Sequence, residues 1–259
     1  MKLLLMTSML LFSSLAISAE RMQAFRRANN KEVMLEAGYI FIQSKASIKS
    51  LGTTYNSDNS QTSAIVTGEF GVTEDIAIGT SIAKIHSDGE EGLDDYNIHI
   101  KGQYQDFFYT ATYFISPGDQ ENDNFYSGGN YYSLSLGYQL TSSFAVQAAI
   151  TPEYDFKFKN DTTDYVSGTS YQLNAFYEHK VNNKDVLGFS GGFLYSKANT
   201  DDGETYSDDT RYATLQVYYN AFMYGLELNP SLAYMNYMSF NDDTKATITL
   251  LNLMIRKRF

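Results

Sequence analysis

Charged residues recur at one depth of successive alternating segments in this sequence. Each lies a few residues from the same end of its segment, on the face that otherwise carries small or polar side chains. Opposite charges brought together in a space shielded from water either form structural ion pairs or select the charge of passing ions. The members of this set are Glu36, Glu69, Lys101, Glu178, Glu227 and Arg256, with His99, Lys180 and Arg258 close by.

Three members of this set would meet if the first and last segments were neighbouring strands. Glu36 lies in the first segment, Arg256 in the last and Glu227 in the segment before it. We favour a structural ion-pair cluster that locks the closure of the fold. The alternative is a selectivity constriction, in which the whole set would line a pore.

The histidines and serines offer little for catalysis. His86 is expected at a segment end, His99 on the inner face and His179 on the outer face near a turn. A hydrolytic centre needs Ser and His side by side with an orienting partner, and no Ser lies two positions from a His on the outer face. Without Cys, disulfides and thiolate metal sites are excluded. We predict no enzyme activity, no cofactor and no metal site.

The segments that position these residues alternate with period two, which is typical of strands between an apolar and a polar medium. In 95–104, for example, Tyr96, Ile98 and Ile100 alternate with His99 and Lys101. We expect strands at 32–44, 62–72, 76–85, 95–104, 107–116, 130–140, 144–158, 169–181, 186–196, 211–220, 222–234 and 247–259.

The connections between these segments alternate in length. Short turns follow every even segment and long polar loops, such as 49–61, follow every odd one. A soluble sandwich gives no reason for this regularity, and each segment reaches the ~9 to 11 residues that cross a bilayer at a tilt. The sequence therefore predicts an all-β fold, a transmembrane antiparallel up-and-down β-barrel of twelve strands with both termini on the periplasmic side.

More than half of the 30 acidic residues fall in the long loops. Solvated loops explain most of this, and divalent cations that bridge them to lipopolysaccharide are a lesser alternative. The acidic loop residues include Asp88, Glu90, Glu91, Asp119, Glu121, Asp123, Asp201, Asp202, Glu204, Asp208, Asp209, Asp242 and Asp243.

The N-terminus has the organisation of a secretory signal peptide. Lys2 precedes an apolar run that is too short to span a bilayer, and small residues follow it. We expect residues 1–19 to be removed by cleavage after Ala19, with Ser18 as the alternative position. Residues 20–31 are polar and basic, and form either a periplasmic leader or a short plug. Residues 32–259 form the barrel.

The last segment resembles the C-terminal signal of bacterial outer-membrane β-barrels. Alternating apolar residues end there on an aromatic residue, which in those proteins the barrel-assembly machinery reads. Lys257 departs from this pattern, although its stem can lie along lipid while its ammonium reaches water. The residues that carry the signal are Leu251, Leu253, Ile255 and Phe259.

Two nearby stretches, 113–119 (YFISPGD) and 127–138 (SGGNYYSLSLGY), resemble the transporter-type porin family of meta-pathway phenol degradation. That family often has a strand that ends in Pro-Thr-Gly-Asp, but the Thr is missing here. The resemblance implies an outer-membrane channel for small or apolar solutes. Channels for acidic sugars need strips of Arg and Lys, which the mixed charges of this lumen fit poorly.

The expected inner face is rich in small residues such as Ala77, Ser81 and Gly188. Twelve strands lie between the eight that side chains fill and the sixteen to eighteen that leave a wide channel. We predict a narrow outer-membrane channel for passive diffusion of small solutes. The alternative is a structural or surface-interaction barrel whose lumen is closed. Expected partners are outer-membrane lipid, lipopolysaccharide, the assembly machinery and small solutes, and the net charge of −11 argues against nucleic acid.

Overall fold

A computed structural model describes most of the chain. The described residues are 18–19, 22, 25–50, 53–87, 90–93, 96–116, 126–127, 129–158, 165–201, 204–205, 209–238 and 244–259. The predicted signal peptide up to residue 17 lies outside them, as do Asp88, Asp119, Glu121, Asp123, Asp202, Asp208, Asp242 and Asp243. The signal peptide, its cleavage site and the lipopolysaccharide contacts therefore remain predictions.

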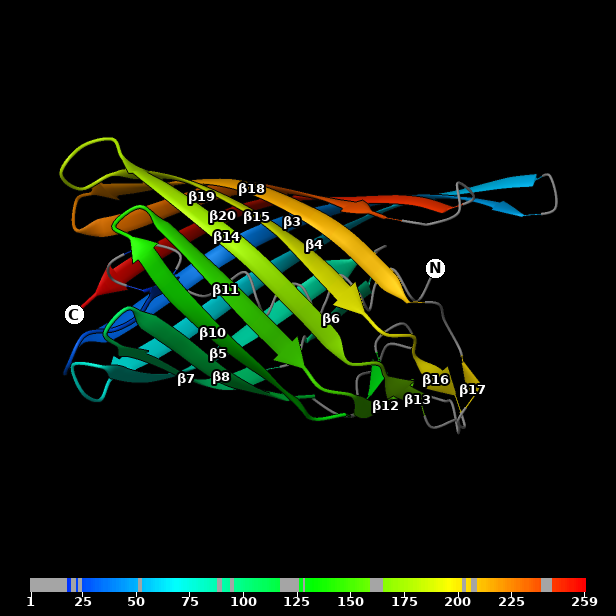
Figure 1. The fold of residues 1–259 in the computed structure, drawn as a ribbon, viewed down its shortest axis with the longest axis horizontal. Helices are drawn as coiled ribbons and strands as arrows, with labels where there is room; N and C mark the ends of the chain where they lie inside the picture. Colours follow the sequence, from blue (N-terminus) through cyan, green and yellow to red (C-terminus); the bar gives the residue numbers. More distant parts are fainter. Residues whose placement is uncertain are drawn as a thin grey trace.

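The chain forms a closed antiparallel barrel (Figure 1). Twelve of the 13 strands in the main sheet make the wall, and the short β6 (Glu90–Leu93) pairs only with β5. Consecutive wall strands are neighbours, which confirms the predicted up-and-down barrel. The wall strands are β3 (Val33–Ser50), β4 (Thr53–Gly71), β5 (Ile76–Ser87), β7 (Tyr96–Tyr104), β8 (Phe107–Ile115), β10 (Tyr131–Thr141), β11 (Phe144–Thr151), β14 (Ser170–Lys180), β15 (Val186–Ser196), β18 (Thr210–Met223), β19 (Leu226–Tyr237) and β20 (Thr244–Arg258).

The barrel closes where the last strand pairs with the first. The β20–β3 register runs from Thr244 opposite Ile48 to Arg258 opposite Met34. The backbone N–H of terminal Phe259 then donates to the Val33 carbonyl at 2.9 Å, and the Val33 N–H donates to the Phe259 carbonyl at 3.2 Å. The C-terminus thus lies at the end of the barrel that carries the short turns, called the short-turn end below (Figure 1).

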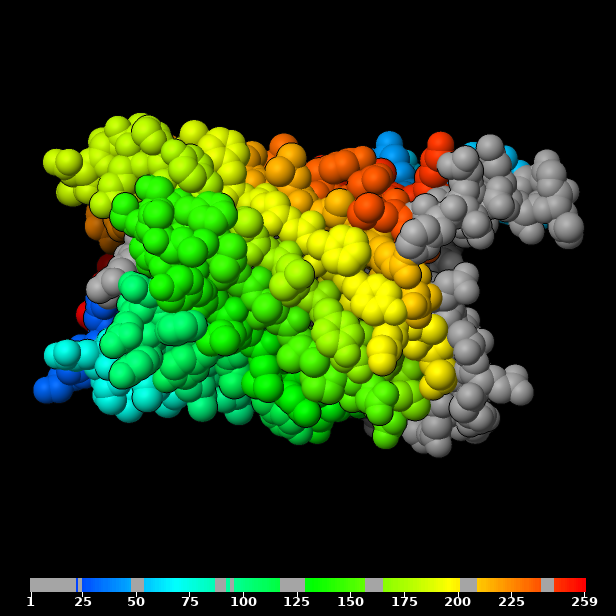
Figure 2. Space-filling model, viewed as in Figure 1, coloured from blue at the N-terminus to red at the C-terminus, as the bar shows by residue number. Residues whose placement is uncertain are grey.

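Side chains alternate between the two faces of the wall. On β7, Ile98 and Ile100 are 52% and 45% exposed, whereas His99 and Lys101 are 5% and 6% exposed. The side chains of neighbouring strands close the face of the wall seen in Figure 2. An apolar outer surface on a closed barrel is the arrangement that hydrocarbon requires, because closure leaves no unpaired strand edge. Among the described residues, no helix has the length and apolar character needed to cross a bilayer.

The boundary predicted between 211–220 and 222–234 is wrong. β18 continues to Met223, and the turn falls at Tyr224 and Gly225, whose φ angles are 52° and 76°. Positive φ at both central residues gives the tight turn that matches strand twist, and Gly adopts it without strain. Phe222 therefore belongs to β18, and Tyr224 is a turn residue rather than an outward residue of the next strand.

The predicted loop 49–61 is also wrong. β3 and β4 continue as a hairpin that projects beyond the rest of the wall (Figure 1). Lys45 and Asp58 face each other on this hairpin, with Nζ and Oδ2 3.6 Å apart. Backbone pairing holds this hairpin together although most of its described side chains are polar.

The predicted strand 144–158 is interrupted at Pro152, which cannot donate a ladder hydrogen bond. Beyond it, short strands form a separate 5-stranded sheet at the long-loop end. These strands are β9 (Tyr126–Ser127), β12 (Tyr154–Phe158), β13 (Tyr165–Ser167), β16 (Thr200–Asp201) and β17 (Glu204–Thr205). A two-stranded pair, β1 (Ser18–Ala19) and β2 (Phe25–Arg26), precedes the wall.

Asp185 ties the turn before β15 to the neighbouring hairpin. Its carboxylate accepts hydrogen bonds from the Phe222 N–H at 3.0 Å and from the Asn182 amide at 2.7 Å. These bonds, that from Phe222 first, hold the pKa of Asp185 below its ordinary value. The ionised form therefore favours the folded turn above pH ~4, and this contribution is lost as the pH falls through the lowered pKa.

We predict that Asp185→Asn lowers hydrogen-exchange protection of the Phe222 amide at neutral pH, because the charge-assisted acceptor is lost. The difference from the wild type should disappear as the pH falls below the folded pKa of Asp185. Protection factors measured on the refolded barrel at both pH values test this. Equal protection at pH 7 would contradict it.

Candidate functional site

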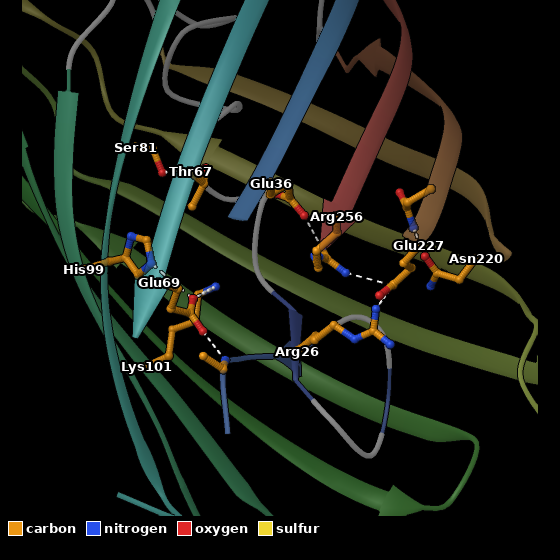
Figure 3. A network of polar contacts seen from close by, with 12 residues as sticks. Arg26, Glu36, Thr67, Glu69, Ser81, His99, Lys101, Asn220, Glu227 and Arg256 are labelled. Carbon is orange, nitrogen blue, oxygen red and sulfur yellow. Dashed lines mark hydrogen bonds and ion pairs between the residues drawn. The ribbon is translucent and has the colours of Figure 1, made fainter. Parts of the chain in front are cut away.

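Ionisable side chains from β4 and β7, the two strands that flank β5, meet inside the barrel at its short-turn end (Figure 3). Glu69 of β4 lies with its Oε2 2.6 Å from Lys101 Nζ and 3.3 Å from His99 Nε2, both on β7. The second ring nitrogen of His99 is 3.2 Å from Asn97 Oδ1. We call Glu69, His99 and Lys101 the Glu69 cluster. The buried carboxylate is paired with a cation, as burial of a charge requires.

A glycine between the two strands allows this contact. Gly79 of β5 is opposite Glu69 on one side and His99 on the other. A Cβ on Gly79 would lie 2.5 Å from His99 Nε2, so the imidazole crosses the space where a side chain would be. The same device recurs at Gly188, across which the Tyr218 hydroxyl donates to Glu178 at 2.6 Å.

We predict that Gly79→Val destabilises the barrel by about 1–3 kcal/mol, because it displaces His99 and leaves buried polar groups without partners. Urea unfolding in detergent micelles measures this. Gly68→Val is the matched control, since a Cβ there meets only Leu35 Cδ2 at 3.7 Å. Equal stability of the two variants would contradict the proposed role of Gly79.

A second cluster lies at the closure of the barrel. Arg256 of β20 is directly opposite Glu227 of β19 and Glu36 of β3. Its Nη1 donates to Glu227 Oε1 at 2.8 Å, and its guanidinium also pairs with the Glu36 carboxylate. We call Glu36, Glu227 and Arg256 the seam cluster. One arginine thus links three strands across the closure, which is the arrangement expected of a structural ion-pair cluster.

The chain before β3 enters the barrel and touches both clusters. Arg26 pairs with Glu227, and the Ala28 N–H donates to the Glu69 carboxylate. The Arg27 side chain donates to the backbone carbonyl of Glu74 in the adjacent turn. The site is therefore built from wall strands together with this N-terminal segment (Figure 3).

The structure brings together most, not all, of the predicted pore-lining residues. Glu178 is buried and accepts a hydrogen bond from Tyr218, and Lys180 is exposed. Arg258 is half-buried, and its Nη1 is 3.1 Å from Glu32. Those that are buried and join one of the two clusters are Glu36, Glu69, His99, Lys101, Glu227 and Arg256. Whether these residues line a conducting pore stays a prediction.

Two features were missed from the sequence. Arg26 belongs to a segment without strand alternation, so no pattern could have assigned it a partner. The inner face also carries a cluster of large apolar residues, whereas small residues were expected there. These apolar residues alternate with the outward residues of the same strands, and this pattern could have revealed the cluster. This cluster contains Ile40, Ile42, Leu194, Tyr212, Ala233, Met235, Ile248 and Leu250.

Comparison with known protein families assigns the chain to one of them. The model of the family described as "Putative MetA-pathway of phenol degradation" matches residues 28–256, nearly the whole barrel. The chain belongs to this family. The resemblance stated from two short stretches of sequence is thereby confirmed. No curated protein sequence matches the chain.

Solved structures are similar to this family member at low sequence identity. The COG4313 outer membrane channel from Pseudomonas putida F1 is 16% identical, with a TM-score of 0.66, over 90% of this chain and 97% of that one. The translocator domain of autotransporter NalP from Neisseria meningitidis is 8% identical, with a TM-score of 0.49, over 87% and 88%. The CymD monoaromatic hydrocarbon channel is 11% identical, with a TM-score of 0.49, over 89% of each chain.

Proposed function

We propose that this protein is an outer-membrane channel for passive diffusion of small solutes. The observation that carries the proposal is a closed twelve-strand wall whose outer face is apolar and whose inner face carries polar and charged side chains beside one apolar cluster. Such a wall separates a hydrated path from lipid. The resemblance to a solved outer membrane channel and the family membership support the same function.

The inner wall favours small solutes. Twelve strands enclose a bore narrower than that of the wide porins. The inner side of this wall carries hydroxyl groups, including those of Thr67 and Ser81, which are buried and whose oxygens are 2.9 Å apart. The charge clusters at the short-turn end form the part of the bore that would discriminate between solutes by their charge.

A second candidate is a structural or surface-interaction barrel with a closed lumen. One observation favours it: the N-terminal segment lies inside the short-turn end and pairs with the wall. In this alternative, Glu69, Arg256 and their partners serve stability alone. The two candidates differ in whether the folded barrel passes solute.

Liposome swelling distinguishes them. We predict that vesicles containing the refolded protein swell in isotonic glycine or arabinose and swell much more slowly in sucrose. A narrow bore passes the smaller solutes faster. Folding is checked by the heat-modifiable migration typical of β-barrels. Absence of swelling with correctly folded protein would favour the closed barrel.

A further inference from the structure

The outer face of the barrel changes from apolar to basic along β15, β18, β20 and β3. Toward the long-loop end, the outward residues of each strand are first apolar and then, in places, polar. On β15, for example, Phe193 is followed on the same face by Tyr195 and then by Lys197, directly after the strand. Each of the four rows ends in a cation. We call these cations, Lys45, Lys197, Arg211 and Lys245, the basic rim.

The other half of the barrel has a different outer edge. β14, β11, β10, β8 and β7 are consecutive in the wall (Figure 1). Among the described residues of these strands, no outward row ends at the long-loop end in a charged side chain. Exposure to water at a strand end does not by itself select cations on one half alone. The last outward residues there are Tyr171, Ile150, Tyr132, Ile115 and Tyr96.

The basic rim consists of two pairs of neighbouring cations, with β19 between them. Arg211 is opposite Tyr195, and its Cζ lies 5.5 Å from the centroid of that ring. Lys197, two residues beyond Tyr195, is therefore diagonal to Arg211. In the same way Lys245 is diagonal to Lys45 across the β20–β3 pair. Diagonal neighbours are about 7–8 Å apart, so the long side chains of each pair can reach one shared anionic group.

Acidic residues offset only part of this charge. Asp58 Oδ2 lies 3.6 Å from Lys45 Nζ. Asp209 accepts hydrogen bonds from the Tyr195 hydroxyl at 2.5 Å and from the Ala198 N–H at 2.9 Å. The four cations of the basic rim and these two carboxylates have a net charge of +2 (four minus two). The rim thus keeps an excess of positive charge.

The surface below the basic rim is apolar. Leu215 of β18, Leu251 of β20 and Phe41 of β3 are 63%, 55% and 39% exposed on the same outer rows. Tyr171 and Tyr195 stack between the two regions, with ring centroids 6.2 Å apart. Tyrosine prefers the boundary between hydrocarbon and water. A ligand that matches both regions has an anionic headgroup above apolar chains.

We propose that the basic rim binds the phosphate groups of a phosphorylated glycolipid in the outer leaflet of the surrounding membrane. The long loops of outer-membrane barrels are extracellular, which would place the rim at the headgroups of that leaflet. Arg and Lys donate charge-assisted hydrogen bonds to phosphate oxygens. The acyl chains would lie along the apolar rows below, which a free phosphate ion would leave unused. This site goes beyond the channel function and does not depend on solute passage.

The test titrates the refolded full-length barrel in detergent with diphosphoryl lipid A, in the presence of EDTA, and counts bound lipid by native mass spectrometry. We expect saturable binding to the wild type. The Lys45→Gln/Lys197→Gln/Arg211→Gln/Lys245→Gln variant should bind roughly tenfold more weakly or worse, because each lost cation reduces the attraction to an anionic lipid. Lipid A without its phosphates should bind the wild type as weakly as the phosphorylated lipid binds this variant.

The matched control removes the same number of cations at the short-turn end. Lys31, Lys180, Lys184 and Lys257 are exposed there. The Lys31→Gln/Lys180→Gln/Lys184→Gln/Lys257→Gln variant should bind diphosphoryl lipid A like the wild type. A heat-modifiable band shows that each variant is folded.

Four results would overturn the proposal. Equal binding by the wild type and the rim variant would show that the basic rim holds no lipid. Equal losses in the rim variant and the control would show a response to total charge alone. Binding that requires added Mg²⁺ would indicate cation bridges to acidic residues instead of direct contacts. Inorganic phosphate that displaces the lipid at equal concentration would indicate a site for a free anion.

Discussion

Replacing Arg256 by Ala is expected to destabilise the barrel by about 3–5 kcal/mol, because it leaves the buried Glu36 carboxylate without its cation, whereas Glu227 keeps its pair with Arg26. Arg256 contacts both Glu36 and Glu227, so its loss also removes the cation that lies between these two acids at the closure. Urea unfolding of the refolded barrel measures the stability. If the seam cluster also faces the ion path, the same variant will shift the reversal potential toward cation preference.

Lys257→Ala is the matched control for this prediction. Lys257 is the next residue along the strand but points outward, with its Nζ 4.8 Å from the centroid of the Phe259 ring. The Lys257→Ala substitution removes the same charge outside the bore and should leave the reversal potential unchanged. Loss of stability in Arg256→Ala with an unchanged reversal potential would assign the seam cluster to structure alone. Unchanged stability would contradict the ion-pair cluster itself.

Removal of Phe259 is expected to give the second large effect, loss of most of the protein from the outer-membrane fraction. Phe259 ends the strand that resembles the signal read by the barrel-assembly machinery, and its backbone makes two hydrogen bonds with Val33 at the closure. Quantifying folded, heat-modifiable protein in membrane fractions tests this prediction.

Phe259→Tyr is the control, since it keeps an aromatic ring at the terminus and should assemble nearly as well as the wild type. Normal amounts of the shortened protein in the outer membrane would show that the terminal residue carries no assembly signal in this chain. Failure of Phe259→Tyr would show that the assembly step requires more than an aromatic ring.

The wall strands could be predicted because a strand between an apolar and a polar medium alternates apolar and polar residues with period two. The alternation placed Glu36, Glu227 and Arg256 inward, and closure of the barrel put them opposite one another. The contact of Glu69 with His99 depends instead on Gly79, an intervening residue whose missing side chain leaves space for the imidazole. Contacts that reach across an intervening strand can be predicted only when the pairing register of all three strands is known. The sequence does not reveal this register directly.

Other features depend on interactions that leave no periodic pattern in the sequence. The hairpin between Lys45 and Asp58 continues through polar residues, so loss of apolar alternation did not mark the end of its strands. The turn at Tyr224 uses positive φ angles in a stretch where outward residues continue on both sides. Residues 25–30 find their partners only once the wall exists, because their contacts come from several strands, among them β4, β8, β14 and β19.

The most direct test of the channel proposal is the conductance of the refolded mature wild type in a planar bilayer under a salt gradient. We predict small, stable, discrete current steps, as a narrow bore with paired inner charges would give. The reversal potential would then show whether the inner charges or the acidic loops set the ion preference. Silence from protein shown to be folded would contradict an open channel and favour the closed, structural barrel.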